Sequence, residues 1–406
     1  MEHHHIEITE ERFDFNSKTK NFVFMLIGLG LICTLAGVLM LKGEAGNIME
    51  KRFWGSMLLA GYYTTLISLC GTVFIGINYL SNAGWSAAIK RIPEAMGQYL
   101  PIGVLTLLII FFVGREHVFE WSIPEIMNND SLLQGKSSFL NTTFFVGGSI
   151  LFFGLYYFFT RYFRRLSIRE DKEKGTKIFH TNRRVAGGFM AIFGFTFPVI
   201  SWMWMMSIDP HWFSTIYSIY NFAILWVCGI ATICMFVLFL KGRGYLKIVT
   251  EEHLHDLGKF MFAFSIFWTY IWVSQYLLIW YANLPEESIY YVERKGEHFG
   301  FQFWFNLIIN FAAPLLILMT KNSKRKRNTL ITAGAIILCG HWNDLYLMVM
   351  PNVAGEQATI GLMEIGTTIF FFGIFIYVTL ASLAKQSLIA VGHPYIEESA
   401  RHEINP

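Results

Sequence analysis

The sequence predicts an all-α integral membrane protein with about ten transmembrane helices. Three observations carry this prediction: hydrophobic residues make up 54% of the 406 residues, charged residues only 15%, and the apolar residues gather in long runs. Soluble domains carry about 25% charged residues. A helix needs about 20 mostly apolar residues to cross about 30 Å of hydrocarbon. The runs are also too long for membrane β-strands and lack their alternation.

Ten apolar runs are suited to crossing a membrane as helices. In chain order they are 21–41, 53–80, 99–114, 139–163, 186–206, 213–240, 257–282, 299–320, 329–350 and 359–384. Residues 1–20 are charged and lack the layout of a signal peptide, so we expect the first run to be retained as a span. Before the sixth run, Asp209 and Pro210 are typical of a helix start, with Asp209 as N-cap.

Lys and Arg are divided unevenly between the two sets of connections. The connections on the side of the N-terminus hold 25 of the 32 Lys and Arg residues. Because loops retained in the cytoplasm carry the positive excess, we expect both termini there. The net charge of +3 is too small to predict nucleic-acid binding.

A weak internal repeat predicts the domain organisation. Segment 91–105 resembles segment 251–265, although coincidence between apolar segments is an alternative. A shift of four helices preserves orientation, so we expect two four-helix bundles related by a parallel repeat, with two peripheral helices. The predicted divisions are a cytoplasmic tail (1–20), a peripheral helix and loop (21–52), the two bundles (53–212 and 213–358) and a peripheral helix with a tail (359–406).

Ionisable residues inside the spans are candidates for function because they are costly in hydrocarbon. His341 and Asp344 share a face of the ninth predicted helix, and Glu364 lies near the outer end of the tenth. An imidazole beside a buried carboxylate can pass protons, while a polar cluster that joins helices is the alternative. The inner end of the seventh helix carries further candidates for a proton route, or for a solvated helix start: His253, His255, Asp256 and Lys259.

Two other regions could accommodate a quinone. Asp209 and His211 lie in an outer connection, and Gln275 lies in the aromatic segment 264–288. Tyr, Trp and Gln around an apolar cleft could receive a quinone ring, whereas an aromatic helix packed on lipid is the alternative. The five cysteines lack the spacing of haem, iron–sulfur or other metal motifs, so we expect no metal centre on this chain.

Two stretches resemble a known family. MSIDPHWFSTIYSIYNF (206–222) and LGKFMFAFSIFWTYIWVSQYLLIWYANLPEES (257–288) are similar to the ActF-type subunits of bacterial alternative complex III, in the broader NrfD/polysulfide-reductase-anchor family. The resemblance extends over all ten predicted helices. It implies a haem-free inner-membrane subunit of a quinol:electron-acceptor (cytochrome c) oxidoreductase with no independent activity.

The resemblance also implies partners and leaves alternatives open. It implies c-type cytochrome and iron–sulfur subunits that carry the haems and clusters, a paralogous NrfD-like membrane subunit, and lipids; a terminal oxidase is a further candidate. Menaquinol or another quinol is the implied substrate, and this type of subunit is associated with quinone binding or proton conduction. The chain could instead be the quinol-oxidising anchor itself. A secondary transporter is a third alternative, although no pair of broken helices at matching positions is evident.

Overall fold

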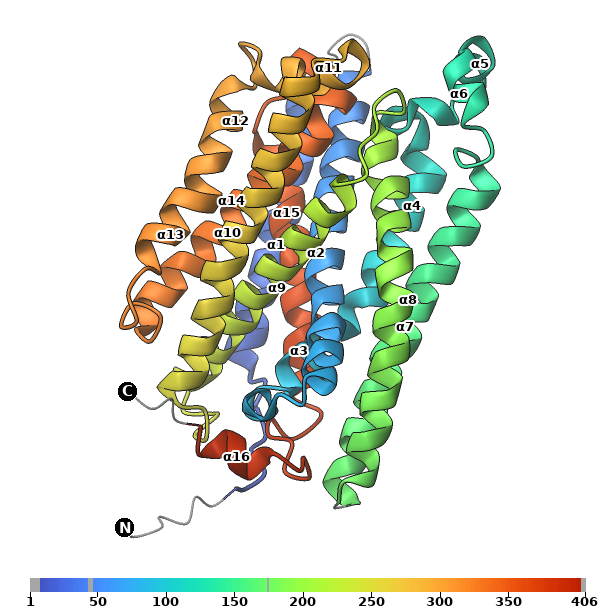
Figure 1. Ribbon diagram of the computed structural model, residues 1–406. Helices are drawn as coiled ribbons and strands as arrows, with labels where there is room; N and C mark the ends of the chain where they lie inside the picture. Colours follow the sequence, from blue (N-terminus) through green and yellow to red (C-terminus); the bar gives the residue numbers. More distant parts are fainter. Residues whose placement is uncertain (1–7, 43–46, 174, 403–406) are drawn as a thin grey trace.

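The computed structural model describes residues 8–42, 47–173 and 175–402. Within these ranges, ten long helices run side by side along one direction (Figure 1). Nine of them are long enough and apolar enough to cross a membrane. The tenth, Arg327–Ala354, has 28 residues but is more polar, since it contains His341, Asn343 and Asp344. The all-α integral membrane fold is therefore confirmed.

The long helices are α1 (Ser17–Leu41), α2 (Ile48–Leu80), α3 continued by α4 (Arg91–Met96, Leu100–Val118), α7 (Thr142–Lys172), α8 (Lys177–Trp204), α9 (Tyr217–Lys241), α10 (Glu251–Ala282), α12 continued by α13 (Gly300–Leu307, Ala313–Ile317), α14 (Arg327–Ala354) and α15 (Leu362–Leu383). The short helices are α5 (Pro124–Asn129), α6 (Ser131–Gly135), α11 (Pro285–Lys295) and α16 (Ile396–Ala400). A π-helical turn spans Ile308–Ala312, and 3-10 turns span Gly84–Ala88, Gly97–Tyr99, Glu120–Ser122, Met206–Ile208 and Gly355–Gln357.

Helix α2 lies at the centre of the molecule, and its most apolar stretch is entirely buried. It packs against α4 and α8 on one side and against α9, α14 and α15 on the other. Helices α2, α4, α7 and α8 form one group of neighbours, and α9, α10, α12, α13 and α14 form a second group. The internal repeat that would relate these groups stays a prediction.

Helices α1 and α15 pack closely through glycines. A Cβ atom added at Gly30 would lie 2.4 Å from the backbone nitrogen of Phe370, and one at Gly373 would lie 2.7 Å from a side-chain atom of Ile27. Small residues let transmembrane helices approach closely and gain van der Waals contacts. The first and last long helices of the chain are therefore direct neighbours, and most of α1 otherwise faces outward.

Two features differ from the sequence-based expectation. The basic connection after the fourth run is mostly helical, because α7 continues to Lys172 and α8 starts at Lys177. The end of an apolar run indicates where a helix leaves the hydrocarbon, but the helix itself can continue beyond that point. The predicted helix start at Asp209 is wrong: α9 begins at Tyr217. Asp209 instead accepts the backbone N–H of Trp212 at 3.3 Å, in a turn that buries the Trp212 ring.

The connections α2–α3, α7–α8, α9–α10 and α13–α14 lie at one end of the bundle, together with the start of α1 and with α16 (Figure 1). This is the end to which the sequence assigns most of the Lys and Arg residues. Helices α5, α6 and α11 lie at the opposite end. We refer to these as the basic end and the far end.

The glycine contact between α1 and α15 can be tested with a matched pair of variants. Gly30→Leu would overpack the interface, so we expect a loss of about 1–3 kcal/mol of stability. Gly28→Leu is the control, since a Cβ there meets nothing within 4 Å. Thermal unfolding of the purified variants measures the difference. Equal melting temperatures would contradict the close approach.

Candidate functional site

Asp344 on α14 is a buried carboxylate that accepts hydrogen bonds from three other helices. Its Oδ1 accepts from the hydroxyl of Tyr220 on α9 and from Nδ2 of Asn306 on α12, the latter at 2.7 Å. Its Oδ2 accepts from the indole N–H of Trp268 on α10 at 2.9 Å. A buried carboxylate is tolerated only when such donors replace water. Four helices therefore meet at this side chain.

The local backbone allows α12 and α14 to come close at this point. Asn310 lies in the π-helical turn and donates through Nδ2 to Asn306 Oδ1 at 2.7 Å. Gly340 of α14 faces it, and a Cβ there would lie only 2.3 Å from Asn310 Oδ1. Single π-helical turns are frequent at functional sites. The glycine and the π turn together let Asn306 reach Asp344, with Asn310 bound to Asn306 behind it.

His341 forms a pair with Asp344. The ring is fully buried, and its Nδ1 lies 3.6 Å from Asp344 Oδ2. Neither ring nitrogen has a hydrogen-bond partner among the residues that the structure describes. Trp268 packs edge-on against the ring, with the ring centroids 5.2 Å apart. An imidazole with free nitrogens beside a carboxylate can accept a proton and return it.

A small cavity adjoins Asp344. Its volume is about 20 Å³, which is room for about one water. Gln275 of α10 lines it, so the structure places this predicted residue beside Asp344 and not beside Asp209 or His211. Arg294, Tyr290 and Tyr291 of α11 line it as well.

Arg294 is a buried cation that sequence reasoning missed. Its Nε donates to the Leu347 carbonyl at 2.8 Å, and its guanidinium carbon lies 3.4 Å from the Tyr290 ring centroid. The residue lay outside every predicted span and therefore counted as an outer-loop charge. The i, i+4 spacing of Tyr290 and Arg294 in a helix that Pro285 starts was the available signal.

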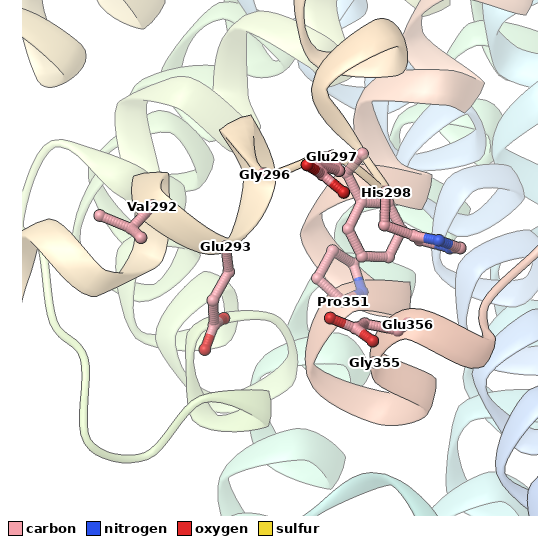
Figure 2. A pocket seen from close by; sticks show the side chains of 9 residues that line it. Val292, Glu293, Gly296, Glu297, His298, Pro351, Gly355 and Glu356 are labelled. Carbon is pink, nitrogen blue, oxygen red and sulfur yellow. The ribbon is translucent and has the colours of Figure 1, made fainter.

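Beyond Arg294, an open pocket of about 750 Å³ lies at the far end of the molecule (Figure 2). The side chains of Glu293, Glu297, His298 and Glu356 surround it. Glu293 Oε2 lies 3.9 Å from an Arg294 Nη1, and burial raises the pKa of the Glu293 carboxyl. Polar groups thus lead from the Asp344 cavity towards the solvent at this end.

The four residues predicted at the inner end of the seventh helix lie together at the start of α10. Asp256 Oδ1 lies 2.5 Å from Lys259 Nζ, and its Oδ2 lies 2.7 Å from Nε2 of His402 in the C-terminal segment. His255 Nδ1 lies 3.6 Å from a Glu252 oxygen. The cluster is therefore tied to the basic end of the molecule.

His253 has a different environment within this cluster. It is fully buried, its Nδ1 accepts the backbone N–H of Thr250 at 3.1 Å, and its Nε2 lies 3.2 Å from the hydroxyl of Ser399. It caps the first turn of α10 and joins it to α16. These contacts give His253 a clear structural role.

A largely apolar stretch of α10 separates the two clusters. Lys259 and Trp268 are nine residues apart, which is about 13.5 Å along a helix. Ser265 lies between them and is 1% exposed, and its hydroxyl has no partner among the described residues. It is a polar group partway along this stretch.

The structure does not bring Glu364 to His341 and Asp344. Arg52 on α2 binds its Oε1 through Nη2 at 2.8 Å and through Nε at 2.9 Å, and both side chains are buried. Its Oε2 accepts the backbone N–H of Gly361 at 2.9 Å and caps α15. Asp209 lies in a turn, and His211 Nε2 lies 2.6 Å from Asp130 Oδ2 at an exposed site. That hydrogen bond lowers the pKa of the Asp130 carboxyl.

A second buried charge cluster at the basic end was also missed. Lys90 Nζ lies 3.1 Å from Glu170 Oε2, and Arg91 Nη1 lies 2.9 Å from Glu94 Oε2. Arg91 also pairs with Asp171. The pairs of Lys90 with Glu170 and of Arg91 with Asp171 join the start of α3 to the end of α7, a region that the sequence analysis counted only as connections between helices. The acidic pair Glu170-Asp171 inside a basic run was the available signal.

Comparison with known proteins places the chain in no family. No protein-family model matches it, and no curated protein matches it. Across the described ranges, no three His, Cys, Asp or Glu side chains gather so that they could hold a metal ion.

The hydrogen bond from Tyr220 to Asp344 can be tested with a matched tyrosine pair. Tyr220→Phe removes a donor from a buried carboxylate, so we expect a loss of about 1–3 kcal/mol of stability. Tyr346→Phe is the control, because that buried hydroxyl has no partner among the described residues. Thermal unfolding of the two variants measures the difference. An equal effect of both substitutions would mean that Tyr220 does not stabilise Asp344.

Proposed function

We propose that this chain is a haem-free membrane subunit of a bacterial quinol:cytochrome c oxidoreductase complex, and that it conducts protons through its second helix group. The observation that carries the proposal is the buried pair of His341 and Asp344, in which neither imidazole nitrogen has a hydrogen-bond partner among the described residues. The resemblance of 206–222 and 257–288 to NrfD-like anchors supports the assignment to such a complex. In this proposal the c-type haems, the iron–sulfur clusters and the site of menaquinol oxidation belong to partner subunits.

The proposed route has an inner mouth, a central relay and an outer exit. Asp256 and its neighbours at the start of α10 form the mouth. Waters bridge the stretch past Ser265, since about 13.5 Å is too long for a direct transfer. A ring nitrogen of His341 then takes the proton, and the Asp344 carboxylate stabilises the imidazolium. The cavity beside Asp344 and the acidic pocket around Glu293 form the exit.

Glu364 is not part of this route. Its carboxylate is bound by Arg52 and by the backbone of Gly361, so both oxygens already have partners. We assign Glu364 to the packing of α15 against α2.

The basic end faces the cytoplasm of a bacterial inner membrane in this proposal. The excess of Lys and Arg on the connections at that end supports this orientation. Ser323 lies between α13 and α14 in one of these connections. A cysteine at Ser323 should resist an impermeant thiol reagent added to intact cells and react after lysis. Labelling of this cysteine in intact cells would show that the basic end faces the outside and would contradict the proposed orientation.

The proton route predicts a specific effect of Asp344→Asn. The amide keeps the size of the side chain but cannot titrate, so proton release per quinol oxidised should fall while the haem content stays normal. The measurement uses the complex purified through a tag on this chain and reconstituted in vesicles. Unchanged turnover and proton release would make His341 and Asp344 packing residues. If the wild-type chain purifies without any haem protein, the alternative of a secondary transporter is favoured instead.

Quinol binding is a second candidate, which one recess favours. An open recess of about 340 Å³ lies between α10 and α11 and is lined by Tyr276, Trp280 and Tyr291. Lys295 Nζ donates to the hydroxyl of Tyr276 there at 2.8 Å. The size and the aromatic lining suit a quinone ring. A structure of the purified assembly with a quinone analogue decides between this recess and a site on a partner.

A further inference from the structure

A basic pocket lies between α7 and α15 at the basic end of the molecule. Its volume is about 590 Å³, and it is open to the outside. Four cationic side chains line it, from Arg161, Arg164, Arg165 and Lys385, and no carboxylate does. The function proposed above does not use this pocket.

The four cations form no close ion pairs within the described part of the chain. None of them forms an ion pair with a carboxylate there. Arg164 is held in place, because its Nη2 donates to the Ser382 carbonyl at 2.9 Å and its Nη1 to the Glu94 carbonyl at 3.3 Å. Arg165 and Lys385 are exposed. Four like charges that converge on one pocket repel each other unless an anion joins them.

The depth of the pocket matches a membrane surface. It lies where the apolar runs 139–163 and 359–384 end and where the run 99–114 begins. Its wall includes apolar side chains, namely those of Ile168, Val378 and Ala381. Cations at the level of lipid head groups therefore adjoin an apolar surface at the level of acyl chains.

We propose that this pocket binds the phosphate head group of an anionic phospholipid. The guanidinium groups of Arg161 and Arg165 present paired N–H donors that match phosphate oxygens, and Lys385 adds a point charge. Basic pockets between transmembrane helices on the cytoplasmic side are suited to such head groups. The apolar wall distinguishes a lipid from a free phosphate ion, which would gain nothing from Val378 or Ala381.

The bound lipid would connect two parts of the fold. Arg164 already joins α7 to the end of α15 and to α3 through backbone carbonyls. A phosphate between Arg165 of α7 and Lys385 behind α15 adds a second connection between the same elements. The lipid would therefore stabilise the attachment of α15 to the first helix group.

The test compares lipid binding by the full-length chain and by two double variants in a neutral detergent. Arg165→Gln with Lys385→Gln removes two pocket cations. Arg183→Gln with Arg184→Gln removes two exposed cations of α8 that do not line the pocket. Cardiolipin, phosphatidylglycerol, phosphatidylcholine and inorganic phosphate are each titrated. Thermal shifts and lipid retained in native mass spectra are recorded for every protein.

We expect cardiolipin and phosphatidylglycerol, but not phosphatidylcholine, to raise the melting temperature of the wild type and of the α8 variant. The pocket variant should bind the anionic lipids at least about tenfold more weakly, with an unchanged melting temperature in lipid-free detergent. An equal loss of lipid affinity in both variants would mean that anionic lipids are attracted by surface charge in general, and it would overturn the proposed binding site. Stabilisation by inorganic phosphate alone, equal to that by lipid, would make it a free-anion site and overturn the lipid assignment.

Discussion

The position of Asp344 imposes the strictest constraint on this fold. A carboxylate inside a membrane bundle needs donors for both oxygens, and here they come from Tyr220, Trp268 and Asn306 on three different helices. A shift of any of these helices by one residue would turn its donor away from the carboxylate. Gly340 and the π-helical turn serve the same contact, since they let α12 approach α14. The second helix group is arranged around one side chain.

The two helix groups use charge differently. The first group closes the basic end with buried ion pairs, in which Lys90 and Arg91 meet carboxylates from α3 and α7. The second group surrounds Asp344 with neutral donors, and the His341 ring beside it has no hydrogen-bond partner in the part of the chain that the structure describes. The ion pairs of the first group hold α3 and α7 together, because removing one partner would leave an uncompensated buried charge. An imidazole beside a carboxylate is the arrangement suited to a proton relay, which is why we propose proton transfer in the second group.

Sequence patterns predicted the features that depend on residues close together along one helix, namely the positions of the helices and the residues that share a face. The apolar runs indicated the long helices, and the i, i+3 spacing of His341 and Asp344 indicated a shared face. Contacts between distant segments could not be predicted this way: Arg52 and Glu364 are 312 residues apart, and nothing in either run indicates the other. Hydropathy also treats every charge outside a span as solvated. Arg294 and Lys90 are buried against protein in such segments, so their roles became visible only in the structure.

The pairing of α1 with α15 has a consequence for how the chain is made. Ribosomes deliver the first span to the membrane long before the last, so α1 must wait in lipid while more than three hundred further residues are translated. Its glycine-lined surface has no permanent partner during that interval. The interface between α1 and α15 can therefore form only after the last span has been synthesised. A chain truncated before α15 would leave the glycine-lined surface of α1 uncovered and open to membrane proteases.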